Sequence, residues 1–173
     1  MPPTRDSSAA GGCVNRRKVV GIILLLGFVV SLFAVFFLTE QSAQDTTSLS
    51  NGIVQVILCV LVIFQIEPTG IDPWLISWFV RKLAHTVEFF VIGMFAAATC
   101  IAWTKQGGVH RAFVRATFLS VASSLFDQFH KLFVPGREFD YLDLAFDALG
   151  YLIAIRLVRM LSEKAIARSR HKA

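Results

Sequence analysis

Long apolar runs alternate with short polar segments along this chain. The first run, residues 19–38, contains no charged side chain and directly follows the basic triplet Arg16-Arg17-Lys18. About 20 apolar residues in a helix suffice to cross the roughly 30 Å hydrocarbon core of a bilayer. Because no small-x-small cleavage site accompanies the run, the pattern favours an uncleaved transmembrane helix over a signal peptide.

Three later runs predict further spans, which carry charged residues near their ends. These spans cover residues 83–103, 112–129 and 141–161. A shorter run, residues 53–66, would extend only ~21 Å as a helix at 1.5 Å per residue, which is too short to cross a bilayer unaided. We therefore expect a re-entrant or interfacial helix there, on the outer side of the membrane.

Composition supports the same class of protein. Hydrophobic residues make up 55% of the 173 residues and charged residues only 17%, and the mean hydropathy is +0.62. These values exceed those of soluble globular domains and exclude a large soluble catalytic domain. The sequence predicts an all-α, polytopic transmembrane helical bundle of four spans. A polar tail over 1–18 precedes the transmembrane domain over 19–161, and a basic tail follows over 162–173.

The positions of Lys and Arg predict the orientation. Thirteen of the seventeen basic residues fall in the N-terminal tail, in the turn over 104–117 or in the stretch from Arg156 onward. Because cytoplasmic loops carry an excess of Lys and Arg, we expect a multi-pass protein of the cell membrane with both termini cytoplasmic. The basic C-terminal end is interpreted as a topology anchor that contacts membrane lipids, not as a nucleic-acid patch. The oligomeric state stays open.

With this topology, ionisable side chains gather near the outer ends of the last three spans. They fall on shared helix faces at i+3, i+4 or i+7 spacing: Arg81, His85 and Glu88; Asp127, His130 and Lys131; Asp143 and Asp147. Unpaired charges are costly at membrane depth, so we expect these groups to meet in the bundle interior or around a water-filled pocket. A purely structural ion-pair network that fixes the helix register is an alternative.

Such a cluster supports two kinds of chemistry. The basic side chains are candidates to bind the phosphate or carboxylate of an anionic, lipid-linked cell-envelope molecule: Arg81, Lys82, Lys131 and Arg137. The alternative is a membrane-embedded transferase or hydrolase that uses a histidine as general acid or base and an aspartate to orient it. The candidate catalytic residues are His85, Glu88, Asp127, His130, Asp143 and Asp147. Whether the protein is an enzyme stays open.

The pattern also resembles part of a metal site. His85-x-x-Glu88 and Asp127-x-x-His130 each place an imidazole and a carboxylate on one helix face, as in the metal centres of helix bundles. The basic side chains beside them would repel a divalent cation. We therefore predict neither a metal nor another cofactor.

Three motifs resemble the VanZ-like membrane protein family. They are Arg81-Lys82-x-x-His85-x-x-Glu88-Phe89, Asp127-x-x-His130-x-x-Phe133-Val134-Pro135-Gly136-Arg137 and Asp143-x-x-x-Asp147-x-x-Gly150. The resemblance implies a bacterial-type membrane protein associated with low-level antibiotic resistance, specifically to the glycopeptide teicoplanin. Its expected partners are a lipid-linked cell-envelope precursor or a glycopeptide. The resemblance implies no particular biochemical activity.

Two residues depart from the usual pattern of that family. Gln128 replaces a glutamate and Lys131 replaces a glutamine, so the local charge rises by two units. The departures imply an altered ligand preference or a site that relies on Asp143 and Asp147.

Overall fold

The computed structural model describes residues 7–40, 52–56, 72–104 and 108–170. The long helices in order are α1 (Ser7–Glu40), α3 (Pro73–Ala102), α4 (Val109–Lys131) and α5 (Tyr141–Arg170). Residues 52–56 are also helical, and no strand occurs among the described residues. The predicted all-α class is therefore confirmed for this part of the chain.

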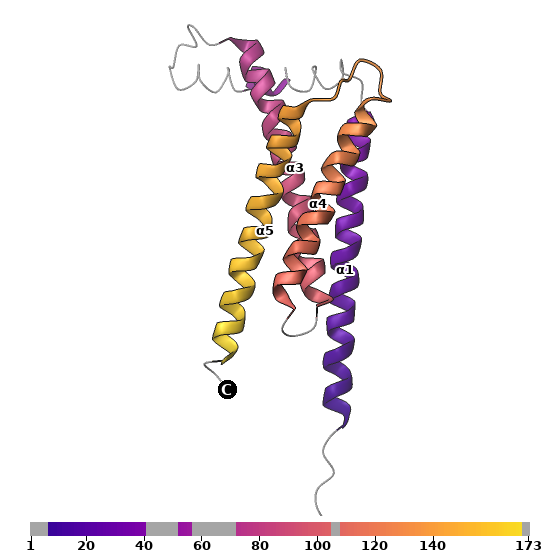
Figure 1. The fold of residues 1–173 in the computed structure, drawn as a ribbon, viewed down its shortest axis with the longest axis vertical. Helices are drawn as coiled ribbons and strands as arrows, with labels where there is room; N and C mark the ends of the chain where they lie inside the picture. The colour runs from indigo at the N-terminus through magenta and orange to yellow at the C-terminus, as the bar shows by residue number, and fades with distance from the viewer. Residues whose placement is uncertain (1–6, 41–51, 57–71, 105–107, 171–173) are drawn as a thin grey trace, which may run out of the picture.

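Helix α3 is the centre of the bundle, because it packs against each of the other three long helices. Figure 1 shows that α1 begins, and α5 ends, at the same end of the molecule, where α3 also ends and α4 begins. At the opposite end, α1 finishes and the segment over 132–140 leads from α4 into α5. This second end contains the candidate site.

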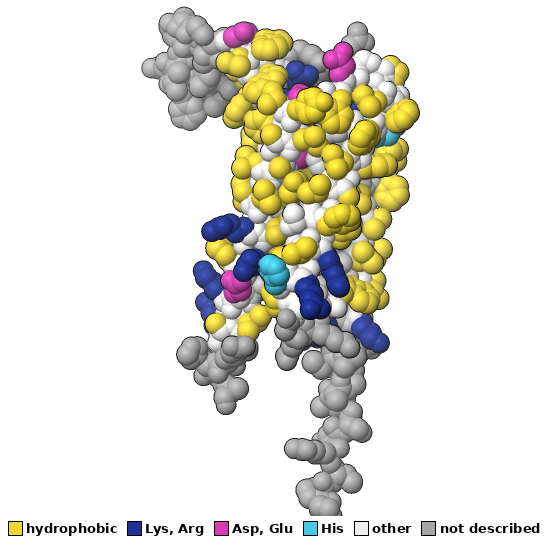
Figure 2. Space-filling model, in the orientation of Figure 1, with side chains coloured by type: hydrophobic (Ala, Val, Ile, Leu, Met, Phe, Trp, Pro, Cys, Tyr) yellow, Lys and Arg dark blue, Asp and Glu magenta, His cyan; other side chains and the backbone are white. Residues whose placement is uncertain are grey.

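Two helices are long and apolar enough to cross a membrane, judged by their length and composition. They are Arg16–Glu40, within α1, and Pro73–Ala102, which is α3. Figure 2 shows hydrophobic side chains over most of the visible face between the two ends, while Lys and Arg gather at the end where α1 begins. A contiguous apolar surface of this extent indicates a membrane protein. The four crossings stay a prediction, since α4 and α5 contain charged residues.

Helix α3 begins ten residues before the predicted span over 83–103. The side chain of Asp72 caps the helix by accepting a hydrogen bond from the backbone N–H of Trp74, and Pro73 occupies the first turn. Asp at the N-cap followed by Pro is a strong helix start, because the Asp side chain accepts from an unpaired N–H group of the first turn and Pro has no N–H group that needs a partner. His85 therefore lies well inside the helix, whereas the predicted span over 83–103 placed it in the first turn.

Other boundaries also differ from the predicted ones. Helix α1 begins at Ser7, so residues 7–18 are helical although they were predicted as a tail. Helix α5 continues to Arg170, nine residues beyond the predicted end of its span. Of the short helix expected over 53–66, residues 57–66 lie outside the described residues.

Close backbone packing of α3 against α5 fixes the relative positions of their polar residues. A Cβ atom added at Gly93 would lie 2.7 Å from the Cα atom of Tyr151, and one added at Gly150 would overlap the carbonyl oxygen of Thr86. Glycine at these two positions lets the helices approach closely. Phe89 and Ile92 of α3 are fully buried in the apolar core beside this contact.

Candidate functional site

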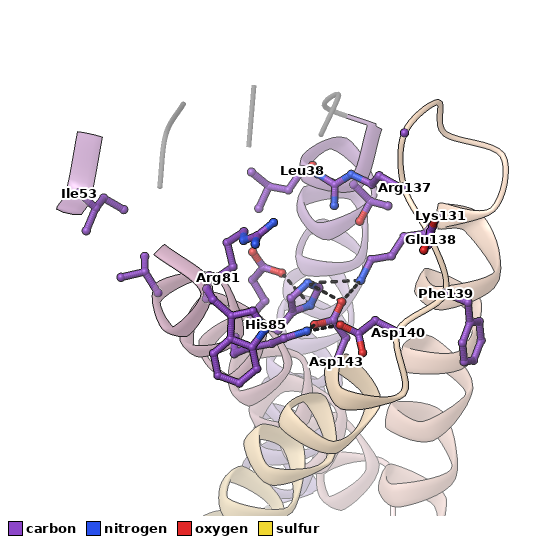
Figure 3. Close-up of a pocket in the computed structure, with 17 residues that line it drawn as sticks. Leu38, Ile53, Arg81, His85, Lys131, Arg137, Glu138, Phe139, Asp140 and Asp143 are labelled. Carbon is purple, nitrogen blue, oxygen red and sulfur yellow. Dashed lines mark hydrogen bonds and ion pairs between the residues drawn. The ribbon is translucent and has the colours of Figure 1, made fainter. Parts of the chain in front are cut away.

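A cavity of about 540 Å³ lies between the four helices at the end where α1 finishes. Ile53 and the segment over 132–140 also contribute to its wall. Nine ionisable side chains among the described residues line it: Arg81, Lys82, His85, Glu88, Lys131, Arg137, Glu138, Asp140 and Asp143 (Figure 3). The cavity thus combines four permanent cations with several carboxylates.

Lys82 is buried and joins α3 to the start of α5. Its Nζ atom lies 2.6 Å from Oδ1 of Asp143 and also donates to the carboxylate of Asp140. Asp140 in turn accepts a hydrogen bond of 2.8 Å from the backbone N–H of Leu142, as an N-cap residue does. Asp140 was not among the predicted catalytic or ligand-binding residues, although an aspartate directly before an apolar helix is a recognisable capping signal.

Lys131 provides the matching contact from α4. Its Nζ atom lies 2.9 Å from Oδ2 of Asp143, 3.2 Å from Oδ2 of Asp127 and 3.3 Å from Nε2 of His85. Asp143 therefore accepts hydrogen bonds from two lysines on different helices. The attraction between these buried charges of opposite sign offsets the free energy that each loses when it is removed from water.

Both ring nitrogens of His85 face charged groups. Nε2 lies 3.3 Å from the ammonium nitrogen of Lys131 and 3.6 Å from Oδ2 of Asp143; the contact with Lys131, which can only donate, is compatible with a ring proton on Nδ1. Nδ1 faces Oδ1 of the fully buried Asp147 at 3.3 Å, although the two atoms are not aligned as a full hydrogen bond. Oδ2 of Asp147 accepts a hydrogen bond of 2.7 Å from Ser124. His85 thus lies between the ammonium group of Lys131 and the carboxylate of Asp147.

Asp127 connects the cluster to α1 and to Gln128. Its Oδ1 atom accepts a hydrogen bond from the hydroxyl of Thr39, near the end of α1. Its Oδ2 atom lies 3.5 Å from Nε2 of Gln128, whose Oε1 atom accepts from the backbone N–H of Asp140 at 3.3 Å. The fully buried amide therefore donates and accepts at once, which a glutamate carboxylate cannot do.

The two arginines differ from the two lysines. The Nε atom of Arg81 is buried and has no hydrogen-bond partner among the described residues. Arg137 donates to the carbonyl oxygen of Leu38 at 3.4 Å. Burial lowers the pKa of Arg137, whereas the carboxylates of Asp127 and Asp143 act in the opposite direction. Figure 3 shows both arginines at the wall of the cavity, apart from the contacts between Lys131, His85 and Asp143.

The structure separates His130 from the other predicted site residues. Its Nε2 atom lies 2.9 Å from Oε1 of Glu40, and its ring centroid is 4.4 Å from that of Phe36. His130 therefore links α4 to α1 outside the cavity. The remaining nine candidates meet at the cavity or contact its lining residues.

A metal would compete with a lysine at this site. His85, Asp127 and Asp147 each offer a ligand atom, and these atoms lie within 4.8 Å of one another. The ammonium group of Lys131 already contacts two of these three residues. A divalent cation would have to displace that group, so the arrangement favours an internal lysine counter-ion over a bound metal.

The apolar helices and the enclosed ionic cluster define a helical membrane protein with a polar cavity at one end of the bundle. The chain belongs to the VanZ/LLP1 family, whose sequence profile matches residues 16–162. The resemblance stated from the motifs is thereby confirmed. No curated protein and no solved structure matches the chain.

Proposed function

We propose that the cavity binds the anionic headgroup of a cell-envelope lipid or lipid-linked precursor. The observation that carries this proposal is the buried Nε atom of Arg81 at the cavity wall, for which the described residues provide no hydrogen-bond partner. A buried donor without a partner is costly, and a phosphate or carboxylate oxygen would satisfy it. Lys82 and Lys131 are already engaged by aspartates, so they would shape the cavity while the arginines contact the ligand.

The distribution of charge supports an outward-facing cavity in a four-span protein. Exposed basic residues such as Arg16, Arg111 and Arg168 belong to the chain segments at the end of the bundle opposite to the cavity. The positive-inside rule assigns that end, with both termini, to the cytoplasm. The cavity would then face the outer leaflet, where envelope precursors are displayed and where glycopeptides act.

Binding can be tested with purified protein in lipid vesicles of phosphatidylcholine with and without phosphatidic acid. Arg81→Gln and Arg137→Gln are expected to weaken the retention of phosphatidic acid by about tenfold each, because a hydrogen bond to a charged group contributes ~1.5–3 kcal/mol. Arg111→Gln, an exposed arginine at the opposite end, is the matched control. Equal retention by all four proteins would rule out the headgroup site.

The proposed link to antibiotic resistance needs a cellular measurement. A Gram-positive host that expresses the wild type should tolerate more teicoplanin than one that expresses Arg81→Gln, at equal membrane abundance of the two proteins. Vancomycin susceptibility measured in parallel tests whether the effect is selective. If the wild type changes neither susceptibility, the site acts on another envelope process.

A second candidate function is catalysis, and the position of His85 between Lys131 and Asp147 favours it. With its ring proton on the side of Asp147, the imidazole would offer its Nε2 lone pair to a substrate that displaces Lys131. This is the arrangement of a general base oriented by a carboxylate. Mass spectrometry of phosphatidic acid incubated with the wild type and with His85→Gln would detect turnover. A product formed equally by both proteins would exclude this role.

A further inference from the structure

A second cavity, of about 300 Å³, opens between α1, α3 and α4. Apolar side chains dominate its lining: Phe28, Leu32 and Phe36 from α1, Phe89 and Ile92 from α3, and Phe126 from α4. Of its polar lining residues, Ser123 donates its hydroxyl to the carbonyl oxygen of Leu119, at 2.8 Å, on its own helix. We name this cavity the apolar groove.

The other two polar residues of the apolar groove lie at the end nearest the ionic cluster. They are Asp127 and His130, which belong to the last turns of α4. Asp127 accepts a hydrogen bond from Thr39, and Thr39 lines the polar cavity. The apolar groove and the polar cavity therefore lie on either side of the buried contact between Thr39 and Asp127.

A charged cavity beside an apolar groove is suited to a ligand with a charged headgroup and a hydrocarbon chain. Along α1, the groove extends from Phe28 to Phe36, which corresponds to ~12 Å of helix at 1.5 Å per residue. Two of the three helices that line it, α1 and α3, are long and apolar enough to cross a membrane, so we expect hydrocarbon and not water around the groove. A ligand with its charged group in the polar cavity would carry its chain past Thr39 into the groove.

We infer that the apolar groove holds a hydrocarbon chain of the same lipid whose headgroup enters the polar cavity. This inference rests on the proposed function and specifies its ligand as a membrane lipid, not a soluble anion. Moving a chain from the bilayer into the groove exchanges one apolar environment for another, so the groove contributes through packing and not through the hydrophobic effect. It orients the lipid so that its headgroup reaches Arg81.

Photo-crosslinking tests where the chain lies. The probe is phosphatidic acid with a diazirine in one acyl chain, present as a minor component of phosphatidylcholine vesicles that contain the full chain. Crosslinks located by mass spectrometry are expected at groove residues such as Leu32 and Phe126. Ala122→Trp fills the groove from α4 and should reduce these crosslinks at least fivefold. Leu125→Trp is the control, because Leu125 is 40% exposed on the same helix and lines neither cavity.

Binding of glycerol 3-phosphate, which has the phosphate of phosphatidic acid but no acyl chain, distinguishes the headgroup site from the chain site. If this soluble headgroup still binds and the crosslinks scatter over the exposed face of the helices, or survive in Ala122→Trp, the chain site is overturned while the headgroup site stands. If neither glycerol 3-phosphate nor phosphatidic acid binds, both proposals fail. If Ala122→Trp does not accumulate, Ala122→Leu narrows the same groove and should lower the crosslinks in the same direction.

Discussion

Ion pairs occur at both ends of this bundle, but in opposite environments. In the cluster, the side chains of Lys82 and Lys131 are 6% and 3% exposed. Near the end of α5, Arg159 and Glu163 form a pair at 2.8 Å in which the side chains are 52% and 54% exposed. Exposed pairs contribute little because water solvates each partner alone, whereas a buried charge that loses its partner has no substitute. Ion pairs therefore add little stability at the exposed end of the bundle, whereas in the buried cluster each charged residue needs its partner.

The largest effect should come from removing one cation of the cluster. Lys131→Met leaves Asp127 and Asp143 buried with fewer donors, so we expect the free energy of unfolding to fall by ~3–5 kcal/mol. The measurement is the thermal unfolding midpoint of the protein in detergent, together with its membrane abundance. The double variant with Asp143→Asn should lose less than the sum of the single variants, because the two residues interact directly. Additive losses would contradict the pairing.

A second variant tests whether backbone packing or ion pairing positions the cluster. Gly150→Ala places a methyl group against the carbonyl oxygen of Thr86 at the contact between α3 and α5. We expect a loss of ~1–3 kcal/mol, as for overpacked cores, without removal of any charge. Unfolding in detergent measures it. Gly52→Ala is the control, since the described residues place no atom of another segment within 4 Å of a Cβ at that position.

Helix spacing predicted much of this site because it defines which residues share a face. Arg81, His85 and Glu88 on α3 and Asp143 on α5 meet at the cavity as their spacing indicated. Spacing along one helix does not identify partners on another helix. Thr39 and Ser124 therefore could not be selected: a single hydroxyl in an apolar run has no signal until the helices are packed.

The position of His130 illustrates the same limit. It follows Asp127 by three residues, yet its ring contacts Phe36 and Glu40 of α1, whereas Asp127 contacts Lys131 as well as Thr39 of α1. The way in which α1 packs across α4 determines which partners each of the two side chains contacts. This packing cannot be read from the sequence of α4 alone. The start of α3, in contrast, was present in the sequence as the Asp72-Pro73 capping signal.

A third variant examines the departure at position 128. Gln128→Glu replaces the amide that donates toward Asp127 with a carboxylate 3.5 Å from it. Two buried carboxylates repel, so we expect a loss of ~1–3 kcal/mol at neutral pH, the penalty typical of a buried group without its hydrogen bond. Protonation of one carboxylate as the pH falls should narrow the difference from the wild type. A difference that is constant between pH 8 and pH 5 would contradict the repulsion.

The smallest effect is expected at the exposed pair. Arg159→Gln removes the hydrogen bond to Glu163 and the cation beside the ring of Phe113, which lies 5.8 Å from the guanidinium carbon. Because both charged groups are half exposed, the free energy of unfolding should change by less than about 1 kcal/mol. High salt screens the attraction between Arg159 and Glu163, so the difference between the variant and the wild type should become smaller. The unfolding midpoints of Arg159→Gln and Lys131→Met, compared at low and high salt, complete the test. A loss at Arg159 as large as that at Lys131 would mean that burial does not distinguish the two ends of the bundle.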